Sequence, residues 1–169
     1  GGDELFAGYS RYVTDRKRSG YGRIPKTVRR KVLERAGAML PHAAPGKNYL
    51  HNISLDPLDR YIDSISAFNR PRKGYLYSPG LAASLNGSGS AAERLFKQFG
   101  EKLPASDPLA RLLYLDSKTY LPGDILTKVD RMTMANSIEA RVPLLDHELI
   151  ELVAAMPSGL KMKGTETKY

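Results

Sequence analysis

The first nine residues, Gly-Gly-Asp-Glu-Leu-Phe-Ala-Gly-Tyr, combine residue types that can hold a phosphate group. Gly1 and Gly2 favour a tight turn in which backbone amides approach an anion, and the acidic-then-apolar run after them is typical of a helix start. Asp3 is well placed to hold a magnesium ion that bridges phosphate oxygens, because that ion prefers oxygen ligands. The alternative is a glycine-rich turn in which Asp3 or Glu4 only complements the helix dipole.

A second candidate region runs from Leu121 to Asp146 and is the most distinctive stretch of the chain. On a helix, Asp124, Lys128 and Arg131 are spaced so that they share one face. That face could present cations to phosphate groups, or it could hold ordinary i,i+4 surface pairs worth about 0.2–0.5 kcal/mol each. The same helix carries a broad apolar stripe. The stripe consists of Ile125, Leu126, Val129, Met132, Ala135 and Ile138.

The turn after this helix is flanked by Glu139, Arg141 and Asp146. An arginine between carboxylates in a sharp turn is most often a structural clamp, and we interpret this group in that way. The residue before a proline avoids helical geometry, so the segment 141–143, which ends in Pro143, is expected to be extended.

Helices must position these residues, and the chain is rich in helix signals. Asp-Pro-Leu occurs twice, at Asp56 and Asp107, with an N-cap aspartate and a proline at the first helical position. Helices are expected over 24–40, 91–99, 107–120 and 122–138, from Asp56 onward, and from Asp146 to Pro157. Loops or connectors are expected over 19–22, 41–50, 69–80 and 86–90. Strand-like alternation is nearly absent, so the predicted fold class is mainly α.

Composition limits the classes of protein that remain. The length of 169 residues favours one domain with its own core, and 41% hydrophobic with 26% charged residues is ordinary for a soluble globular chain. No run approaches about eighteen apolar residues and no secretory signal is present, so we expect a cytoplasmic protein without a membrane partner. The absence of cysteine excludes disulfides, zinc thiolate sites and cysteine nucleophiles within this sequence.

The net charge of +8 is concentrated in the first 50 residues, which hold 11 Lys and Arg against 4 Asp and Glu. Such a patch could attract RNA, a nucleotide or an acidic partner. A solvated helix face is the commoner explanation. No aromatic platform or known nucleic-acid motif interleaves with the patch, so nucleic acid is not the expected partner.

Three blocks together resemble the glutamine-hydrolysing, B-type asparagine synthetase family, in its C-terminal synthetase domain. They are the opening Gly-Gly-Asp-Glu-Leu-Phe-Ala-Gly-Tyr, the helix Asp-Ile-Leu-Thr-Lys-Val-Asp-Arg-Met-Thr-Met-Ala and the turn Glu-Ala-Arg-Val-Pro-Leu-Leu-Asp-His. The blocks occur in the family's order and are followed by a Gly-x-x-x-Lys element, Gly164 to Lys168. The combination is highly specific to the superfamily and less specific to asparagine as the product.

The resemblance implies the helical C-terminal part of an α/β pyrophosphatase-type domain that binds ATP and Mg²⁺. It implies a ligase that adenylates the side-chain carboxylate of aspartate and releases pyrophosphate; ammonia from glutamine then displaces AMP to give asparagine. Asp3 matches the family aspartate that helps to hold magnesium and pyrophosphate. Lys168 matches the catalytic lysine near the pyrophosphate, where a cation offsets charge on the leaving group.

The remaining candidate positions take their roles from the same resemblance. Gly1, Gly2, Lys128 and Arg131 are candidate nucleotide-binding residues. Glu4, Asp124, Glu139 and Arg141 are candidate substrate-binding or supporting residues. The expected partners are small molecules, namely ATP, ammonia and aspartate or a similar carboxylate, and a homodimer is left open.

Two family elements do not occur in the sequence, namely the nucleotide-binding Ser-Gly-Gly-x-Asp-Ser loop and the cysteine that hydrolyses glutamine. The chain opens inside a motif and stops without a helix stop signal. We therefore expect residues 1–169 to be part of a synthetase domain, truncated at both ends and inactive alone. The segment 49–102 matches no family motif. The alternatives are an amidotransferase for another carboxylate, a basic tRNA- or nucleic-acid-binding module, and a helical interaction domain with a degenerate site.

Overall fold

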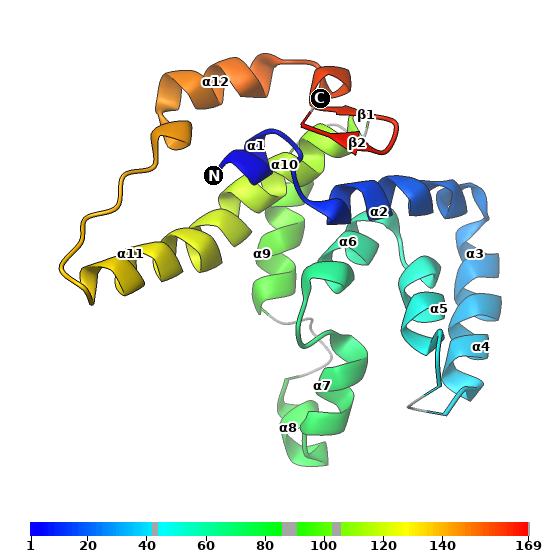
Figure 1. Cartoon of the computed structure of the whole chain (residues 1–169). Helices are drawn as coiled ribbons and strands as arrows, with labels where there is room; N and C mark the ends of the chain where they lie inside the picture. The colour runs from blue at the N-terminus through cyan, green and yellow to red at the C-terminus, as the bar shows by residue number, and fades with distance from the viewer. Residues whose placement is uncertain (42–43, 86–90, 103–105, 169) are drawn as a thin grey trace. The chain divides into compact units, whose positions relative to one another are not determined.

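In the computed structural model, the chain forms a series of short helices, many of which begin at a proline or a small polar cap. The structure describes residues 1–41, 44–85, 91–102 and 106–168. The chain packs as two units, one made of Gly1–Thr14 with Gln98–Tyr169 and the other of Asp15–Lys97 (Figure 1).

The first unit holds both ends of the chain. Its helices and strands are α1 (Gly2–Leu5), the start of α2 (Ser10–Arg18), the end of α9 (Ala91–Gly100), α10 (Pro108–Lys118), α11 (Thr127–Met134), α12 (His147–Ala155), β1 (Met162–Lys163) and β2 (Glu166–Thr167). A π-helical stretch, Leu121–Leu126, leads into α11, and 3₁₀ turns occupy Pro143–Leu145 and Ser158–Leu160. The strands pair antiparallel, with Met162 opposite Thr167. α1 lies against α10 and α12, and the buried apolar residues include Leu109, Leu112, Leu115, Val153 and Met162.

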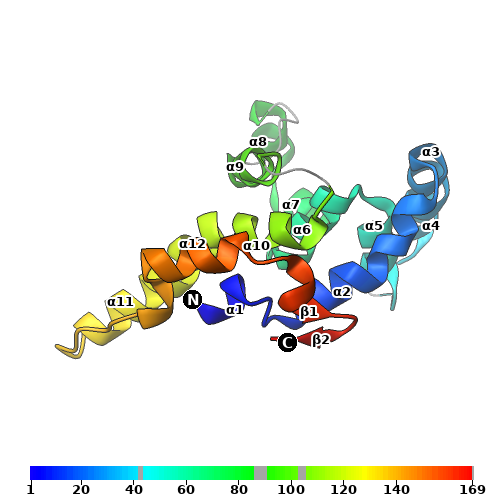
Figure 2. The ribbon, with the colours of Figure 1, turned by 90° about the horizontal axis from the view of Figure 1, so that it is seen from above.

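The second unit consists of helices. It contains the remainder of α2, a 3₁₀ turn at Ser19–Arg23, α3 (Lys26–Val28), a π-helical stretch at Arg29–Leu33, α4 (Glu34–Met39), α5 (Lys47–Ser54), α6 (Pro57–Ile65), α7 (Arg70–Leu76), α8 (Pro79–Ser84) and the start of α9. α4 and the π-helical stretch pack on α5, as the two views show (Figures 1 and 2). The core includes Ile53, Tyr61 and Ile62. A buried arginine, Arg60, pairs with Asp15 at 2.8 Å.

The mainly α prediction is confirmed, and so are two predicted helix caps. The Asp107 carboxylate accepts a hydrogen bond from the Ala110 amide at 3.0 Å, and Asp146 accepts one from the Glu148 amide at 3.0 Å. Asp56 does precede α6, but its carboxylate makes no capping bond. It pairs instead with Lys26 at 2.5 Å and Arg29 at 3.0 Å. These hydrogen bonds, with that from Lys26 the stronger, hold the pKa of Asp56 below its usual value.

Two predicted loops contain helices. The segment 69–80, predicted to be irregular, contains α7 and the start of α8. Asn69 accepts a hydrogen bond from the Arg72 amide, and Ser78 caps α8 through the Leu81 amide, each at 3.3 Å. The connector predicted over 41–50 ends early, because α5 begins at Lys47. The loop predicted over 86–90 lies outside the described residues.

The helix predicted over 122–138 ends at Met134, four residues early. Ser137 adopts a left-handed φ of 56°, and the Ile138 amide donates to the Thr133 carbonyl at 3.0 Å. This is a Schellman ending, which normally has glycine at the left-handed position. Because a serine occupies that position here, the sequence carries no signal for the end of the helix. Val129, Met132 and Ile138 from the predicted apolar stripe are exposed. Helical spacing identifies this apolar face in the sequence, but it does not show what covers the face.

None of the helices in the described ranges is long and apolar enough to cross a membrane.

Candidate functional site

Asp3 and Lys168 come from opposite ends of the sequence and meet within the first unit. The Lys168 Nζ atom lies 2.8 Å from the Asp3 Oδ1 atom. The carboxylate comes from the single turn of α1, and the β1–β2 hairpin leads the last residues of the chain back beside α1 (Figures 1 and 2). The side chain of Lys168 is 60% exposed and that of Asp3 is 38% exposed. An exposed ion pair is weak, so either charge can turn to a ligand at little cost.

The hairpin that carries Lys168 is anchored and sharply turned. Met162 on β1 is buried, and Gly164 supplies the left-handed φ of 61° that the turn requires. Lys168 itself has a φ of 56°, a conformation that costs a non-glycine residue of order 1–3 kcal/mol. Such strain persists only where the surrounding structure enforces it.

Glu4 is fully buried, and its side chain contacts residues that precede and follow α1 in the chain. The Tyr9 hydroxyl donates to Glu4 Oε1 at 2.7 Å, and the backbone nitrogen of Gly1 lies 3.2 Å from Glu4 Oε2. A carboxylate at the third helical position that reaches back to the N-cap nitrogen is half of a capping box. Burial, reinforced by the bond to Glu4, raises the pKa of Tyr9. The role of Glu4 in binding or supporting a substrate stays a prediction.

Gly1 and Gly2 lie under two leucines. A Cβ on Gly1 would lie 2.8 Å from Leu145 Cδ2, and one on Gly2 would lie 2.9 Å from Leu144 Cδ1. The Val-Pro-Leu-Leu turn of the third motif block therefore packs on the opening block. Because α1 has only four residues, its dipole contributes little to anion binding. Phosphate contact by the two glycines stays a prediction.

Lys128 and Arg131, the predicted nucleotide-binding cations, lie on α11. Lys128 Nζ lies 2.7 Å from Asp124 Oδ1, which is the i,i+4 surface pair that the spacing also predicted. The hydrogen bond with Asp124 raises the pKa of Lys128. α11 points away from the β1–β2 hairpin in both views (Figures 1 and 2). Lys128 is paired with Asp124, and the nucleotide-binding roles of Lys128 and Arg131 stay predictions.

Arg141 pairs with one of its two predicted carboxylates. Its guanidinium lies 2.8 Å from Glu139 Oε1, and both side chains are largely exposed. Asp146 instead accepts hydrogen bonds from the first amides of α12. The predicted clamp is therefore limited to Glu139 and Arg141, and an exposed pair of this kind adds little stability.

Comparison with known proteins decides the family. The sequence model of the asparagine synthase family matches residues 1–169, which is the whole chain. The chain belongs to the asparagine synthase family. The resemblance carried by the three motif blocks is thereby confirmed.

Several asparagine synthetases are similar to the chain along its full length. It is 35% identical over 169 residues to putative glutamine-hydrolyzing asparagine synthetases of Mycobacterium tuberculosis and Mycobacterium bovis. It is 36% identical over 172 residues to glutamine-hydrolyzing asparagine synthetase 1 of Bacillus subtilis. These matches cover 25 or 26% of the relatives, so the chain spans about a quarter of their length. No solved structure matches the chain.

Sequence reasoning missed a buried polar cluster in the first unit. The Arg11 guanidinium packs on two aromatic rings, 4.0 Å from the Tyr9 centroid and 4.3 Å from that of Tyr120. It also donates to the fully buried Asp116 at 2.7 Å, and the Tyr12 hydroxyl donates to the same Oδ2 atom at 2.5 Å. Burial and the Asp116 charge raise the pKa of Tyr12. The spacing of Tyr9 and Tyr12 could have indicated a shared face, but no local signal connects Arg11 to Asp116.

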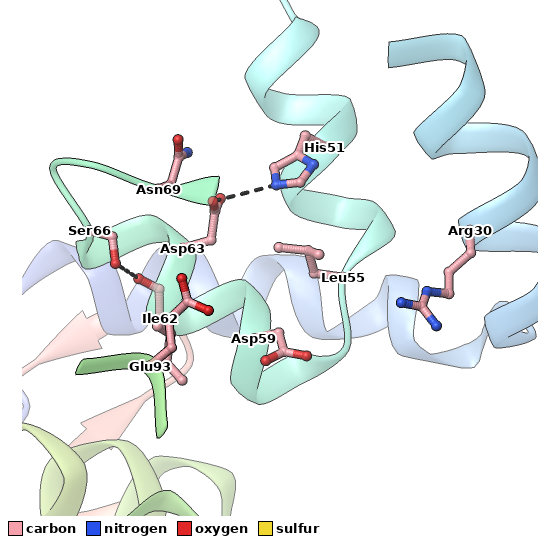
Figure 3. A pocket seen from close by; sticks show the side chains of 9 residues that line it. All are labelled: Arg30, His51, Leu55, Asp59, Ile62, Asp63, Ser66, Asn69 and Glu93. Carbon is pink, nitrogen blue, oxygen red and sulfur yellow. Dashed lines mark hydrogen bonds and ion pairs between the residues drawn. The ribbon is translucent and has the colours of Figure 1, made fainter. Parts of the chain in front are cut away.

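A small pocket in the second unit contains several titratable groups (Figure 3). His51 Nε2 lies 3.6 Å from Asp63 Oδ1, and the side-chain nitrogen of Asn52 donates to Asp63 Oδ2 at 2.9 Å. Burial alone would raise the pKa of Asp63, but the hydrogen bonds from His51 and Asn52 hold it below its usual value. The residues that line the pocket are Arg30, His51, Leu55, Asp59, Ile62, Asp63, Ser66, Asn69 and Glu93.

The other two carboxylates of the pocket also have cationic partners. Lys97 lies 2.9 Å from Asp59, and Lys73 lies 3.4 Å from Glu93. None of the site residues predicted from the sequence lines the pocket. Asp59 and Glu93 thus pair with lysines of their own unit, and we take Asp3 and Lys168 as the candidate site.

Proposed function

We propose that the protein carrying this chain is an ATP-dependent ligase that forms asparagine. In the proposed reaction, the side-chain carboxylate of aspartate is joined to AMP with release of pyrophosphate, and ammonia from glutamine then displaces AMP. The chain would supply the helical C-terminal part of an α/β pyrophosphatase-type ATP-binding domain. The observation that carries the proposal is the 2.8 Å contact between Asp3 and Lys168, two residues far apart in a chain of this family.

Asp3 suits the kind of magnesium site that proteins use with nucleotides. Magnesium is usually held by one or two carboxylates together with substrate phosphates, rather than by a cage of protein ligands. Asp3 is a partly exposed carboxylate, and the part of the chain that the structure describes holds no group of three or more His, Cys, Asp or Glu that could bind a metal. A magnesium ion at Asp3 would thus be bound by the Asp3 carboxylate and by the substrate phosphates, whose negative charge it would neutralise.

Lys168 would act on the leaving group. Negative charge grows on the pyrophosphate oxygens as it departs, and a cation already in place stabilises that charge without further reorganisation. Asp3 holds the Lys168 ammonium in the structure, so the lysine would exchange one anionic partner for another when ATP binds. Backbone amides of Gly1 and Gly2 are proposed to contact the same phosphates.

Other tasks are proposed to belong to other parts of a longer protein. The chain contains no Ser-Gly-Gly-x-Asp-Ser loop to grip ATP, and it contains no cysteine to hydrolyse glutamine. The acceptor carboxylate is also part of the proposal. Pyrophosphate release that depends on a carboxylate other than aspartate would favour the alternative, an amidotransferase for that substrate.

The test is to replace Lys168 by alanine in the longer protein. Pyrophosphate release from ATP, with magnesium, aspartate and ammonia, should fall by about 100-fold, as when one charge-stabilising donor is removed from an active site. Glutamine hydrolysis should be nearly unchanged. Lys163→Ala, on the same hairpin, is the matched control and should leave both activities nearly intact. Unchanged pyrophosphate release in Lys168→Ala would overturn the proposal.

The excess of positive charge in one part of the chain favours a second candidate function, the binding of nucleic acid. The segment Asp15–Lys97 holds 16 Lys and Arg against 6 Asp and Glu, whereas the rest of the chain holds 10 against 12. A surface this basic can attract tRNA, and such binding weakens steeply as salt rises. Submicromolar, salt-sensitive binding of tRNA would favour a nucleic-acid-binding module, and weak or absent binding would remove it.

A further inference from the structure

Gly8 lies directly against the Asp3–Lys168 pair. A Cβ at this position would lie 2.9 Å from Asp3 Cγ and closer still to Asp3 Oδ1 and Lys168 Cε. Real Cβ atoms do not approach other heavy atoms so closely. We propose that Gly8 is a positioning residue: its missing side chain creates the space in which the carboxylate of Asp3 and the ammonium of Lys168 meet.

The backbone at Gly8 is held in place on both sides. The Gly8 amide donates to the Asp3 carbonyl at 2.9 Å, and the preceding Ala7 is fully buried with a left-handed φ of 57°. The following Tyr9 is fixed by its hydrogen bond to Glu4 and by the Arg11 guanidinium, 4.0 Å from its ring centroid. The loop therefore cannot move back to admit a side chain at Gly8.

A side chain at Gly8 would instead displace the ion pair. The atoms in its way belong to the ends of two partly exposed side chains, which can move at little cost to the fold. Gly8 is not among the residues with positive φ, so its backbone conformation tolerates alanine. Gly8→Ala should consequently fold normally and separate Asp3 from Lys168.

A zero-length carbodiimide cross-link tests this directly in the 169-residue chain. The reagent joins a carboxylate and an amine in contact as an amide with loss of water, and mass spectrometry identifies the linked peptides. The unaltered chain should yield an Asp3–Lys168 cross-link, and Gly8→Ala should reduce its yield at least tenfold. Gly159→Ala is the matched control, because a Cβ there meets nothing within 4 Å. A cross-link of unchanged yield in Gly8→Ala would overturn the inference.

Urea unfolding distinguishes positioning from folding. The unfolding midpoint of Gly8→Ala should be close to that of the unaltered chain. If Gly8→Ala lowers the unfolding midpoint, the decrease should be smaller in a variant that also carries Asp3→Ala and Lys168→Ala. In that variant no ion pair occupies the space beside residue 8. A loss of the same size in that background would show that Gly8 acts on folding alone, which would overturn the inference.

The consequence for catalysis rests on the proposed function. In the longer protein, Gly8→Ala should lower pyrophosphate release at least tenfold and raise the magnesium concentration needed for half-maximal rate, while Gly159→Ala should change neither. If Asp3→Ala and Lys168→Ala both leave pyrophosphate release unchanged, the proposed function fails, but the cross-link result still supports the positioning role. A persistent cross-link in Gly8→Ala overturns the positioning role whatever the activity.

Discussion

Asp116 shows how a charge can be buried in this chain. Its carboxylate is fully inaccessible, and it accepts hydrogen bonds from the Arg11 guanidinium at 2.7 Å and the Tyr12 hydroxyl at 2.5 Å. Burying a carboxylate costs several kcal/mol unless partners of this kind replace its water. The Tyr9 and Tyr120 rings, which meet edge to face, both contact the same guanidinium. The cluster thus fixes the start of α2 on α10, next to the loop that carries Gly8.

Asp116→Ala should lower the free energy of unfolding by about 3 kcal/mol, because it leaves the Arg11 charge largely buried without its carboxylate. Asp130→Ala, which removes an exposed carboxylate, should change the same quantity by less than about 0.5 kcal/mol. Urea denaturation followed by circular dichroism measures both. Equal effects of the two substitutions would show that the buried cluster contributes no more than an ordinary surface charge.

At the scale of single elements, the caps decide where helices begin and end. Asp107 and Asp146 could be recognised as caps from the sequence because a helical apolar pattern follows each of them. Asn69 and Ser78 use the same chemistry to begin α7 and α8, but glycine, proline and tyrosine around them obscured the pattern. The end of α11 was missed because a serine, Ser137, takes the left-handed position that glycine normally fills.

Ser137→Gly should raise the free energy of unfolding by about 0.5–1 kcal/mol, because glycine adopts a left-handed φ without steric cost. Ser117→Gly is the matched control within α10, where glycine should lower the same quantity by about 0.5–1 kcal/mol. Thermal unfolding of the two variants and the unaltered chain gives the comparison. A destabilised Ser137→Gly would contradict the Schellman ending that we describe for α11.

At the scale of the whole molecule, the chain packs as two units that differ strongly in charge, and the single domain expected from its length stays a prediction. The candidate site joins residues 3 and 168, so no sequence window could contain it. Asp3 could be named from its own motif, whereas Lys168 could be named only from the resemblance to a family. The folded hairpin was needed to show that Asp3 and Lys168 touch, and nothing in the sequence marks Gly8 as their neighbour.

The 169-residue chain by itself should release no pyrophosphate above background from ATP in the presence of magnesium, aspartate and ammonia. The physical reason is that it contains Asp3 and Lys168 but no Ser-Gly-Gly-x-Asp-Ser loop to hold the nucleotide. A coupled pyrophosphate assay measures this, with the longer protein as the positive control. Clear turnover by the isolated chain would show that ATP is held by residues other than those proposed.

The central claim is that Asp3 and Lys168 act as one unit on the same phosphates. A double-mutant cycle in the longer protein tests it most directly, with aspartate-dependent pyrophosphate release as the measurement. Asp3→Ala and Lys168→Ala should each lower the rate by about 100-fold, and the double variant should be little slower than either, as for residues that act together. A double variant whose loss equals the product of the two single losses would show independent action and contradict the claim.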